Sequence, residues 1–302
     1  MTSRGPGWPT VLGLVLVVIT LSVVDPFQLV LIPLALLLVA LPPRSPGVLV
    51  LAMALAVLAF LGPRGTLWHV ERGWALLVGG WFIAAVVVWP GGSTISRALA
   101  AVVASLVTAA ALIGVRGGWP AIDHTIAGHY RDVAETVART WSTGRMDGDA
   151  LVEWVADIPA LVFPALTALA SAASLAVAWW VSGRITGMPR PLGRLTRFRF
   201  PDILVWVLIA GLALVLMPPA DWGSRLGVNL LVFMGALYAL RGLAVMVALV
   251  LGMVGSSWAV LAVLAIVGVV LYPIVVAGTL LLGVTDTWLD LRSGRRAVND
   301  EG

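Results

Sequence analysis

The sequence predicts an all-α, polytopic transmembrane helix bundle of eight or nine segments with an external amphipathic helical insertion. Of the 302 residues, 60% are hydrophobic and only 11% are charged, whereas globular domains carry about 25% charged residues. The apolar residues form long blocks almost free of charge, separated by short stretches of Gly, Pro and Arg. Each block approaches the roughly 20 residues that a helix needs to cross the bilayer core. The short alternating segments of a membrane β-barrel are not found.

The apolar blocks follow one another along the whole chain. The first two flank Asp25-Pro26, which either closes a tight hairpin or breaks one helix, so we expect eight or nine spans. No small-residue cleavage site precedes the second block, and we therefore expect the N-terminus to be retained as a first helix. In chain order the blocks are Val11–Val24, Phe27–Leu41, Val48–Leu61, Trp74–Trp89, Ala98–Val115, Ile158–Val181, Ile203–Met217, Leu226–Leu251 and Trp258–Leu282.

Arginine placement predicts the orientation of the chain in a bacterial inner membrane, because cytoplasmic loops are rich in basic residues. Residues 182–200 contain five Arg and no acidic residue, whereas residues 116–157 contain four Arg and seven acidic residues. We expect the N-terminus and residues 182–200 to be cytoplasmic and residues 117–157 to be external. The side of the C-terminus stays open, since three further spans would end outside whereas the tail carries Arg292, Arg295 and Arg296.

This orientation divides the chain into four predicted parts: N-terminal transmembrane helices (1–115), an external amphipathic segment (116–157), C-terminal transmembrane helices (158–285) and a polar tail (286–302). The external segment is predicted to lie flat on the outer membrane surface or to cap the bundle. A second short helix is expected to begin after Asp149 and to run into the next span. The apolar stripe of the external helix recurs at helical spacing and consists of Ile122, Ile126, Val133, Val137 and Trp141.

Several function classes are excluded or disfavoured by composition. The chain has no Cys, which excludes disulfides, thiol nucleophiles and Cys-bound metals. Its basic residues follow membrane topology rather than forming a groove, so we expect no nucleic-acid partner. His124 and His129 are five residues apart, on different faces of a helix, and we expect no metal or other cofactor. No G-x-S-x-G, P-loop or H-E-x-x-H motif occurs, so we do not expect an enzyme.

Polar side chains inside apolar blocks are costly in a membrane and are therefore candidates for function. Arg241 either binds an anionic ligand, pairs with a carboxylate such as Asp25 or Asp286, or reaches the lipid headgroups from the end of a tilted helix. A re-entrant bend at Arg241-Gly242 is an alternative. We expect Arg241 to point into the bundle, with Gly242 easing a close backbone approach.

Further polar residues complete the candidate set. Asn229 either makes an interhelical hydrogen bond or contacts a ligand, and a cavity lined by Asn229 and Tyr238 would favour ligand binding. Asp286 and Asp290 are four residues apart and share a face if the last helix continues through Trp288. Together they would bind a cation or relay protons, or else lie solvated at the interface and pair with Arg292.

Three stretches in the last third of the chain resemble one family, the YybS-like bacterial membrane proteins, which is defined by a domain of unknown function. The order and spacing of these stretches carry the resemblance, and the start of the chain fits more weakly. The stretches are Arg199-Phe200-Pro201-Asp202, then Gly227-Val228-Asn229-Leu230-Leu231 running on to Leu237–Val245, and finally Leu282–Arg292.

The family is in turn distantly similar to the substrate-binding S components of energy-coupling-factor transporters. This similarity implies a compact bundle that binds or helps to move a small solute or lipid, without naming the solute. The alternative is a membrane scaffold or accessory subunit that docks a larger assembly. The expected partners are membrane lipids and, for the alternative, other membrane protein subunits.

Overall fold

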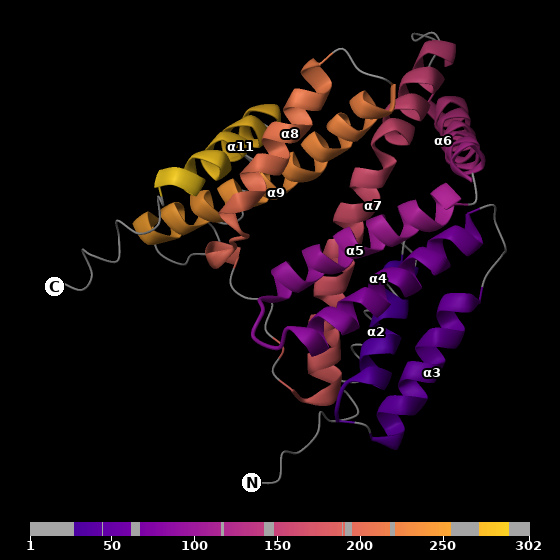
Figure 1. Cartoon of the computed structure of the whole chain (residues 1–302), viewed down its shortest axis with the longest axis vertical. Coiled ribbons are helices and arrows are strands. Elements are labelled where there is room, and N and C mark those ends of the chain that lie inside the picture. Colours follow the sequence, from indigo (N-terminus) through magenta and orange to yellow (C-terminus); the bar gives the residue numbers. More distant parts are fainter. Residues whose placement is uncertain are drawn as a thin grey trace. The chain divides into compact units, whose positions relative to one another are not determined.

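All regular secondary structure in the described part of the chain is helical, as predicted (Figure 1). The structure is a computed structural model, and the chain divides into two compact units, residues 1–192 and residues 193–302. The residues that the structure describes are 27–43, 45–61, 67–115, 118–141, 148–188, 190, 195–217, 221–254 and 272–289.

The first unit is built around α2 (Gln28–Ala40), a short helix that packs against three others. Most of its apolar side chains are buried, with Leu34 and Leu38 fully enclosed, whereas Val39 near its end is 51% exposed. Such burial on every face fits a helix that is hydrophobic all round. Its neighbours are α3 (Pro46–Phe60), α4 (Trp68–Val88) and α7 (Gly148–Thr186), and α5 (Thr94–Val115) packs on α4 and α7.

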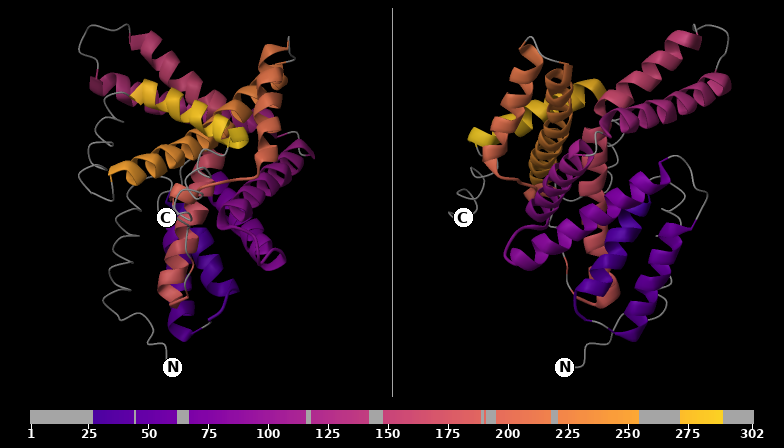
Figure 2. Two further views of the ribbon diagram at one scale, coloured as in Figure 1. Left: turned by 90° about the vertical axis from the view of Figure 1, so that its left-hand side faces the viewer. Right: turned by 45° about the vertical axis from the view of Figure 1, so that its right-hand side comes forward.

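The predicted external helix is present as α6 (Trp119–Trp141), and it pairs with α7 in an α-helical hairpin. Figure 2 shows α6 alongside the first part of α7. Ile126 and Ala134 are buried and Tyr130 meets Phe163 edge-on, so the packed face follows an i, i+4 line. Val133, which we expected on that face, is 43% exposed, and this assignment was wrong. The side chains of Val137 and Trp141 lie outside the described residues.

Helix α7 is longer than the sequence suggested. The predicted short helix after Asp149 and the predicted span from Ile158 form one continuous helix of 39 residues, with Pro159 and Pro164 inside it. Membrane helices tolerate proline where neighbouring groups satisfy the freed carbonyls. The predicted boundary between external and membrane parts at residue 158 therefore lies within a helix.

The second unit contains two short 3₁₀ turns and three α-helices among its described residues. The turns are η1 (Leu195–Arg197) and η2 (Asp202–Leu204), and the helices are α8 (Val205–Leu216), α9 (Asp221–Val254) and α11 (Tyr272–Leu289). Helix α9 packs on both α8 and α11. It runs without interruption through Arg241-Gly242, which excludes the re-entrant bend considered there. Helix α11 begins one residue before Pro273, a position that proline tolerates.

Several described helices are long and apolar enough to cross a membrane: α4, α5, α7 over Asp157–Thr186 and α9 over Trp222–Val250. Helices α2, α3 and α11 and the η2–α8 segment are shorter and apolar. The predicted blocks Val11–Val24 and most of Trp258–Leu282 lie outside the described residues. The number of spans, eight or nine, therefore stays a prediction.

Candidate functional site

The candidate site of the second unit is centred on Arg241, which lies in the apolar helix α9 and is only 1% exposed. Its Nε donates a hydrogen bond of 2.9 Å to Oδ2 of Asp286, and its Nη2 donates one of 3.1 Å to the Asp286 carbonyl oxygen. Asp286 comes from α11 and its side chain is fully buried. This pairing with one of the two carboxylates considered from the sequence places the guanidinium inside the unit.

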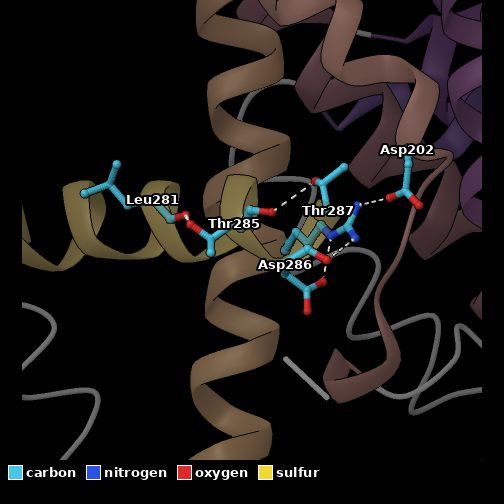
Figure 3. Close-up of polar contacts among 7 residues, drawn as sticks. Asp202, Leu281, Thr285, Asp286 and Thr287 are labelled. Atoms are coloured by element: carbon cyan, nitrogen blue, oxygen red, sulfur yellow. Dashed lines mark hydrogen bonds and ion pairs between the residues drawn. The ribbon is translucent and has the colours of Figure 1, made fainter. Parts of the chain in front are cut away.

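A second carboxylate reaches Arg241 from a third element. Asp202, the first residue of η2, accepts a hydrogen bond of 2.7 Å from Nη1 of Arg241, and its side chain is 63% exposed. Figure 3 shows Asp202 and Asp286 approaching the same guanidinium from different parts of the chain. The two contacts are therefore unequal, since Asp286 is enclosed by protein and Asp202 is open to the surroundings.

An aromatic side chain lies beside the same cation. The guanidinium carbon of Arg241 is 5.5 Å from the centroid of the Phe200 ring, within the range of a cation–π contact. Phe200 is buried and meets Tyr238 edge-on at 5.0 Å. The non-helical stretch that ends at Asp202 is thus held against α9 by an aromatic contact as well as an ion pair.

The close crossing of α9 and α11 brings Asp286 within reach of Arg241. A Cβ atom on Gly242 would lie 1.7 Å from the Thr279 carbonyl oxygen, and one on Gly283 would lie 1.9 Å from the Tyr238 carbonyl oxygen. Both glycines are therefore required by the backbone-to-backbone contact. The geometry agrees with the expectation that Gly242 allows a close backbone approach, here between α9 and α11.

The charges at the site do not cancel. One guanidinium faces two carboxylates, so with all three groups ionised the cluster carries one net negative charge. A buried cation and its carboxylate offset each other's loss of hydration only when both are present, and removing one partner typically costs about 3–5 kcal/mol. The fold therefore cannot lose one member of the Arg241–Asp286 pair while the other stays charged and buried.

The other predicted site residues are distributed differently. Asn229 is 9% exposed and its Nδ2 donates to the Arg225 carbonyl oxygen of its own helix, one of its contacts. It lies about 14 Å from Tyr238 along α9, so the two do not line one small cavity. The Tyr238 hydroxyl is buried near Thr287 and makes no well-formed hydrogen bond with a described residue. Asp290 lies outside the described residues.

The expectation that Asp286 is solvated is wrong, because the residue is 1% exposed and lies inside α11, which continues through Trp288 to Leu289. Sequence reasoning did not single out Asp202 or Phe200 as site residues. Both stand in the Phe-Pro-Asp stretch before an apolar helix. An acidic residue at the start of such a helix is common, so it did not stand out.

The first unit contains another buried arginine, Arg72, whose guanidinium donates hydrogen bonds to backbone carbonyl groups. Arg72 of α4 donates to the carbonyl oxygens of Ala59 and Leu61 at the end of α3, and it lies 4.3 Å from the Trp68 ring centroid. Its neighbour Glu71 accepts a hydrogen bond from the Gln28 amide. Arginines commonly satisfy the free carbonyl groups at a helix end. The predicted span from Trp74 began two residues too late to include Arg72.

No metal-binding cluster is found among the described residues, where no three His, Cys, Asp or Glu side chains gather closely enough to hold an ion. Aromatic and polar groups also meet between helices of the first unit: Trp74 Nε1 donates to Ser171 Oγ, and Phe82 packs edge-on against Trp179. These contacts join α4 to α7 within the apolar interior.

Four of the described helices are long and apolar enough to cross a membrane, and a buried ion pair joins one of them, α9, to the shorter apolar helix α11; these features are typical of an integral membrane protein with several spans. Comparison with known families agrees with this class. The chain belongs to the family described as "predicted membrane protein (DUF2232)", whose model matches residues 10–287. No curated protein and no solved structure matches the chain significantly.

Proposed function

We propose that this protein binds, or helps to move, a small solute or lipid without catalysing a reaction, and that Arg241 contacts an anionic group of that ligand. The resemblance to YybS-like proteins and, more distantly, to transporter S components supports a binding role. Membership of the predicted membrane protein family agrees with the location that such a role needs. The absence of hydrolase, P-loop and zinc-protease motifs from the sequence favours binding over catalysis.

The observation that carries the proposal is the unequal burial of the two carboxylates on Arg241. The Asp286 side chain is fully buried and bonds Nε, whereas the Asp202 side chain is 63% exposed and bonds only Nη1. A carboxylate or phosphate arriving from the open side would therefore replace Asp202 and leave the Arg241–Asp286 pair intact. Such an exchange conserves the charge-assisted hydrogen bond at Nη1, which makes it inexpensive.

The depth of the cluster supports access from water. Arg241 lies about 28 Å along the helix axis from Trp222 and about 14 Å from Val250, the two ends of the apolar stretch of α9. A carboxylate exposed to lipid tails at such a position would be strongly unfavourable. Non-helical backbone at membrane depth is found where it is enclosed by protein or lines a water-filled cavity. The exposed Asp202, at the end of a non-helical stretch, fits a water-accessible entrance.

Two hydroxyl groups near the cation would complete a ligand site. The Tyr238 hydroxyl is buried without a well-formed hydrogen bond among the described residues, and Thr287 lies beside it. A buried hydroxyl without a partner is costly. A ligand oxygen that bridges Tyr238 and Arg241 would satisfy the hydroxyl and the cation together.

We further propose a bacterial inner-membrane location with residues 182–200 in the cytoplasm and 117–157 outside. The contacts within the first unit agree with the prediction that its loops alternate between the cytoplasmic and the external side. Arg190 donates to the Pro42 carbonyl oxygen, and both Arg97 and Arg190 lie beside Trp179. The loops predicted to be cytoplasmic are therefore neighbours, whereas Arg72 joins the end of α3 to α4 in a loop region predicted to be external.

Thermal unfolding of the purified full chain in a neutral detergent tests the proposal, with citrate and inorganic phosphate as probes and chloride at matched ionic strength as reference. Asp202→Asn removes the negative charge that competes with an added anion at Nη1 of Arg241, so we expect both multivalent anions to raise the melting temperature of this variant more than that of wild type. Arg241→Lys removes the planar donor pair and should abolish the response. Asp157→Asn, at an exposed acidic residue of α7, serves as the matched control.

A melting temperature that none of these anions changes beyond chloride, in wild type and in Asp202→Asn, would contradict an anion site at Arg241. Other membrane proteins that co-purify stoichiometrically would, together with that result, favour the scaffold alternative. An equal response in Asp157→Asn would show that the anions act on surface charge in general.

A further inference from the structure

A second cluster of arginines lies in the first unit near Trp179, where α4 and α7 end and α5 begins. The guanidinium carbons of Arg97 and Arg190 are 5.8 and 4.8 Å from the centroid of the Trp179 ring. Arg184 lies over the neighbouring ring of Trp180 at 5.3 Å. These residues come from the start of α5, the end of α7 and the chain just after α7. Three permanent cations therefore share one small region.

The chain beyond α7 is folded back so that Arg190 occupies a defined position. Gly187 has a φ of 69°, a left-handed conformation that favours glycine and ends the helix. A Cβ atom on Gly183 would lie 2.6 Å from the Cβ atom of Arg190, so the returning chain packs directly on this glycine. Nη1 of Arg190 then donates a 2.7 Å hydrogen bond to Oγ of the buried Ser182.

Arg97 is fixed in a similar way. It is 7% exposed, and it donates from Nε to the Trp89 carbonyl oxygen at 2.9 Å and from Nη2 to the Pro90 carbonyl oxygen. These carbonyl groups lie just beyond the end of α4. The hydrogen bonds orient the guanidinium but do not neutralise it, because a carbonyl oxygen carries only a partial charge.

No carboxylate among the described residues forms an ion pair with any of these arginines. Burial lowers the pKa of Arg190, which reflects the unfavourable loss of hydration around its charge. A guanidinium still keeps its proton under these conditions. Within the described part of the chain, the two cations beside the Trp179 ring therefore have no carboxylate partner such as Asp286 is for Arg241.

The surroundings indicate where the counter-charge comes from. Trp89, Trp179 and Trp180 lie at one end of the apolar helices, as tryptophans do at the headgroup level of a bilayer. This is also the end predicted to be cytoplasmic, where anionic phospholipids attract basic residues. We propose that Arg97 and Arg190 bind a phosphate group at this end of the first unit, supplied by the headgroup of an anionic phospholipid.

The site is separate from the Arg241 cluster, and it does not depend on the proposed function of the second unit. Arg190 supplies its remaining N–H groups to the phosphate, and Arg97, beside the same ring, adds positive charge. Trp179 shields the contact from water, which strengthens the charge interaction. Gly183 and Gly187 keep the returning chain close enough for Arg190 to take part.

Binding to the delipidated full-length chain in neutral detergent tests this inference, with short-chain phosphatidylglycerol, short-chain phosphatidylcholine and inorganic phosphate as separate probes. Tryptophan fluorescence follows the titration. We expect phosphatidylglycerol to bind more tightly than phosphatidylcholine, and Arg190→Gln to weaken it about fivefold, the contribution of one basic residue near an anionic headgroup. Arg190→Lys, which keeps the charge, should retain most of the preference. Because Arg97 also caps α4, Arg190→Gln is the decisive variant.

Arg131→Gln is the matched control, since Arg131 is an exposed arginine of α6. Tight binding of inorganic phosphate that depends on Arg190, without binding of phosphatidylglycerol, would support the phosphate site and assign it a soluble ligand. The inference is overturned if phosphatidylglycerol shows no preference over phosphatidylcholine, if Arg190→Gln keeps the preference, or if Arg131→Gln loses as much. Unchanged melting temperatures of the variants would show that all of them are folded.

Discussion

The guanidinium of Arg241 keeps its charge at any accessible pH, and the chain encloses it within an apolar helix. It is held there by hydrogen bonds to the side chain and the carbonyl oxygen of Asp286 and to the side chain of Asp202. The stability of the second unit therefore depends on both members of the buried pair, whereas the Asp202 side chain is 63% exposed.

Single substitutions in this pair should be destabilising. We expect Arg241→Leu or Asp286→Leu to leave one buried charge without its partner and to cost about 3–5 kcal/mol, seen as a lower melting temperature and a lower folded yield in detergent. Arg241→Gln should be milder, because an amide retains hydrogen bonds to Asp286. The double variant, with leucine at both positions, should recover much of the loss. An Arg241→Leu protein as stable as wild type would mean that Arg241 only anchors the helix at the interface.

Residues of this site differed in how well the sequence revealed them. Arg241 and Asp286 stood out because a charge is rare within or beside an apolar block. Asp202 did not, since an acidic residue at the start of a helix has a common explanation. Arg72 and Arg97 were missed because each directly precedes or borders a predicted block, where an arginine normally reaches solvent. Burial of such a residue depends on which helix ends lie beside it, and no local pattern encodes that.

Among the described helices, the crossing of α9 and α11 has the strictest backbone requirement. Gly242 and Gly283 each face a carbonyl group of the other helix at distances that no Cβ atom can occupy. The same crossing positions Asp286 on Arg241. The close packing of α9 on α11 therefore also determines the geometry of the site.

Alanine substitutions separate this requirement from helix propensity. Gly242→Ala and Gly283→Ala should force the two helices apart and lower stability by about 1–3 kcal/mol, as overpacking does. Gly278→Ala is the matched control in α11, because no atom lies within 4 Å of the place that its added Cβ atom would occupy, and alanine favours a helix. Melting temperatures in detergent provide the comparison. Equal effects at positions 278 and 283 would show that the close crossing is not needed.

Some sequence patterns were sufficient to predict the positions of helices, and others were not. Apolar blocks predicted the positions of α2, α3, α5 and the η2–α8 segment to within a few residues, whereas α4 begins at Trp68, before the predicted start at Trp74. The periodicity of the external segment predicted α6 but misplaced Val133, because spacings of three and of four both fit an amphipathic stripe and the partner helix decides between them. Helix α7 passes through Pro159 and Pro164, although proline disfavours a helix interior. Packing overrides the local preference there.

At the scale of the whole molecule, the main prediction is the orientation of the chain in the membrane, which follows from the distribution of Arg and acidic residues. Because the chain contains no Cys, single-cysteine variants can report the side of each loop without background. Met188, just after α7, is 43% exposed, and His129 is exposed on α6. Ser182 is unsuitable because it is buried. We expect Met188→Cys to label only from the cytoplasmic side with a membrane-impermeant maleimide and His129→Cys only from outside. Labelling of both from one face would overturn the orientation.

The sequence was sufficient to predict a helical membrane protein, but it did not predict how the helices group into units. Hydropathy indicates several spans regardless of how they pack, and membership of the predicted membrane protein family agrees with it. The division into units at residues 192 and 193 was not foreseen, because α7 packs with the helices that precede it. Contacts between distant parts of the chain decide this grouping.

The central claim is that the second unit binds a ligand at Arg241, and a density map of the purified full chain in a lipid nanodisc tests it most directly. We predict solute-sized or headgroup-sized density in contact with Arg241 and the Tyr238 hydroxyl, with Asp202 displaced from Nη1 and the Arg241–Asp286 pair intact. A map in which Asp202 stays on Arg241, no such density is present, and other protein chains cover the helices would contradict the claim and favour the scaffold alternative.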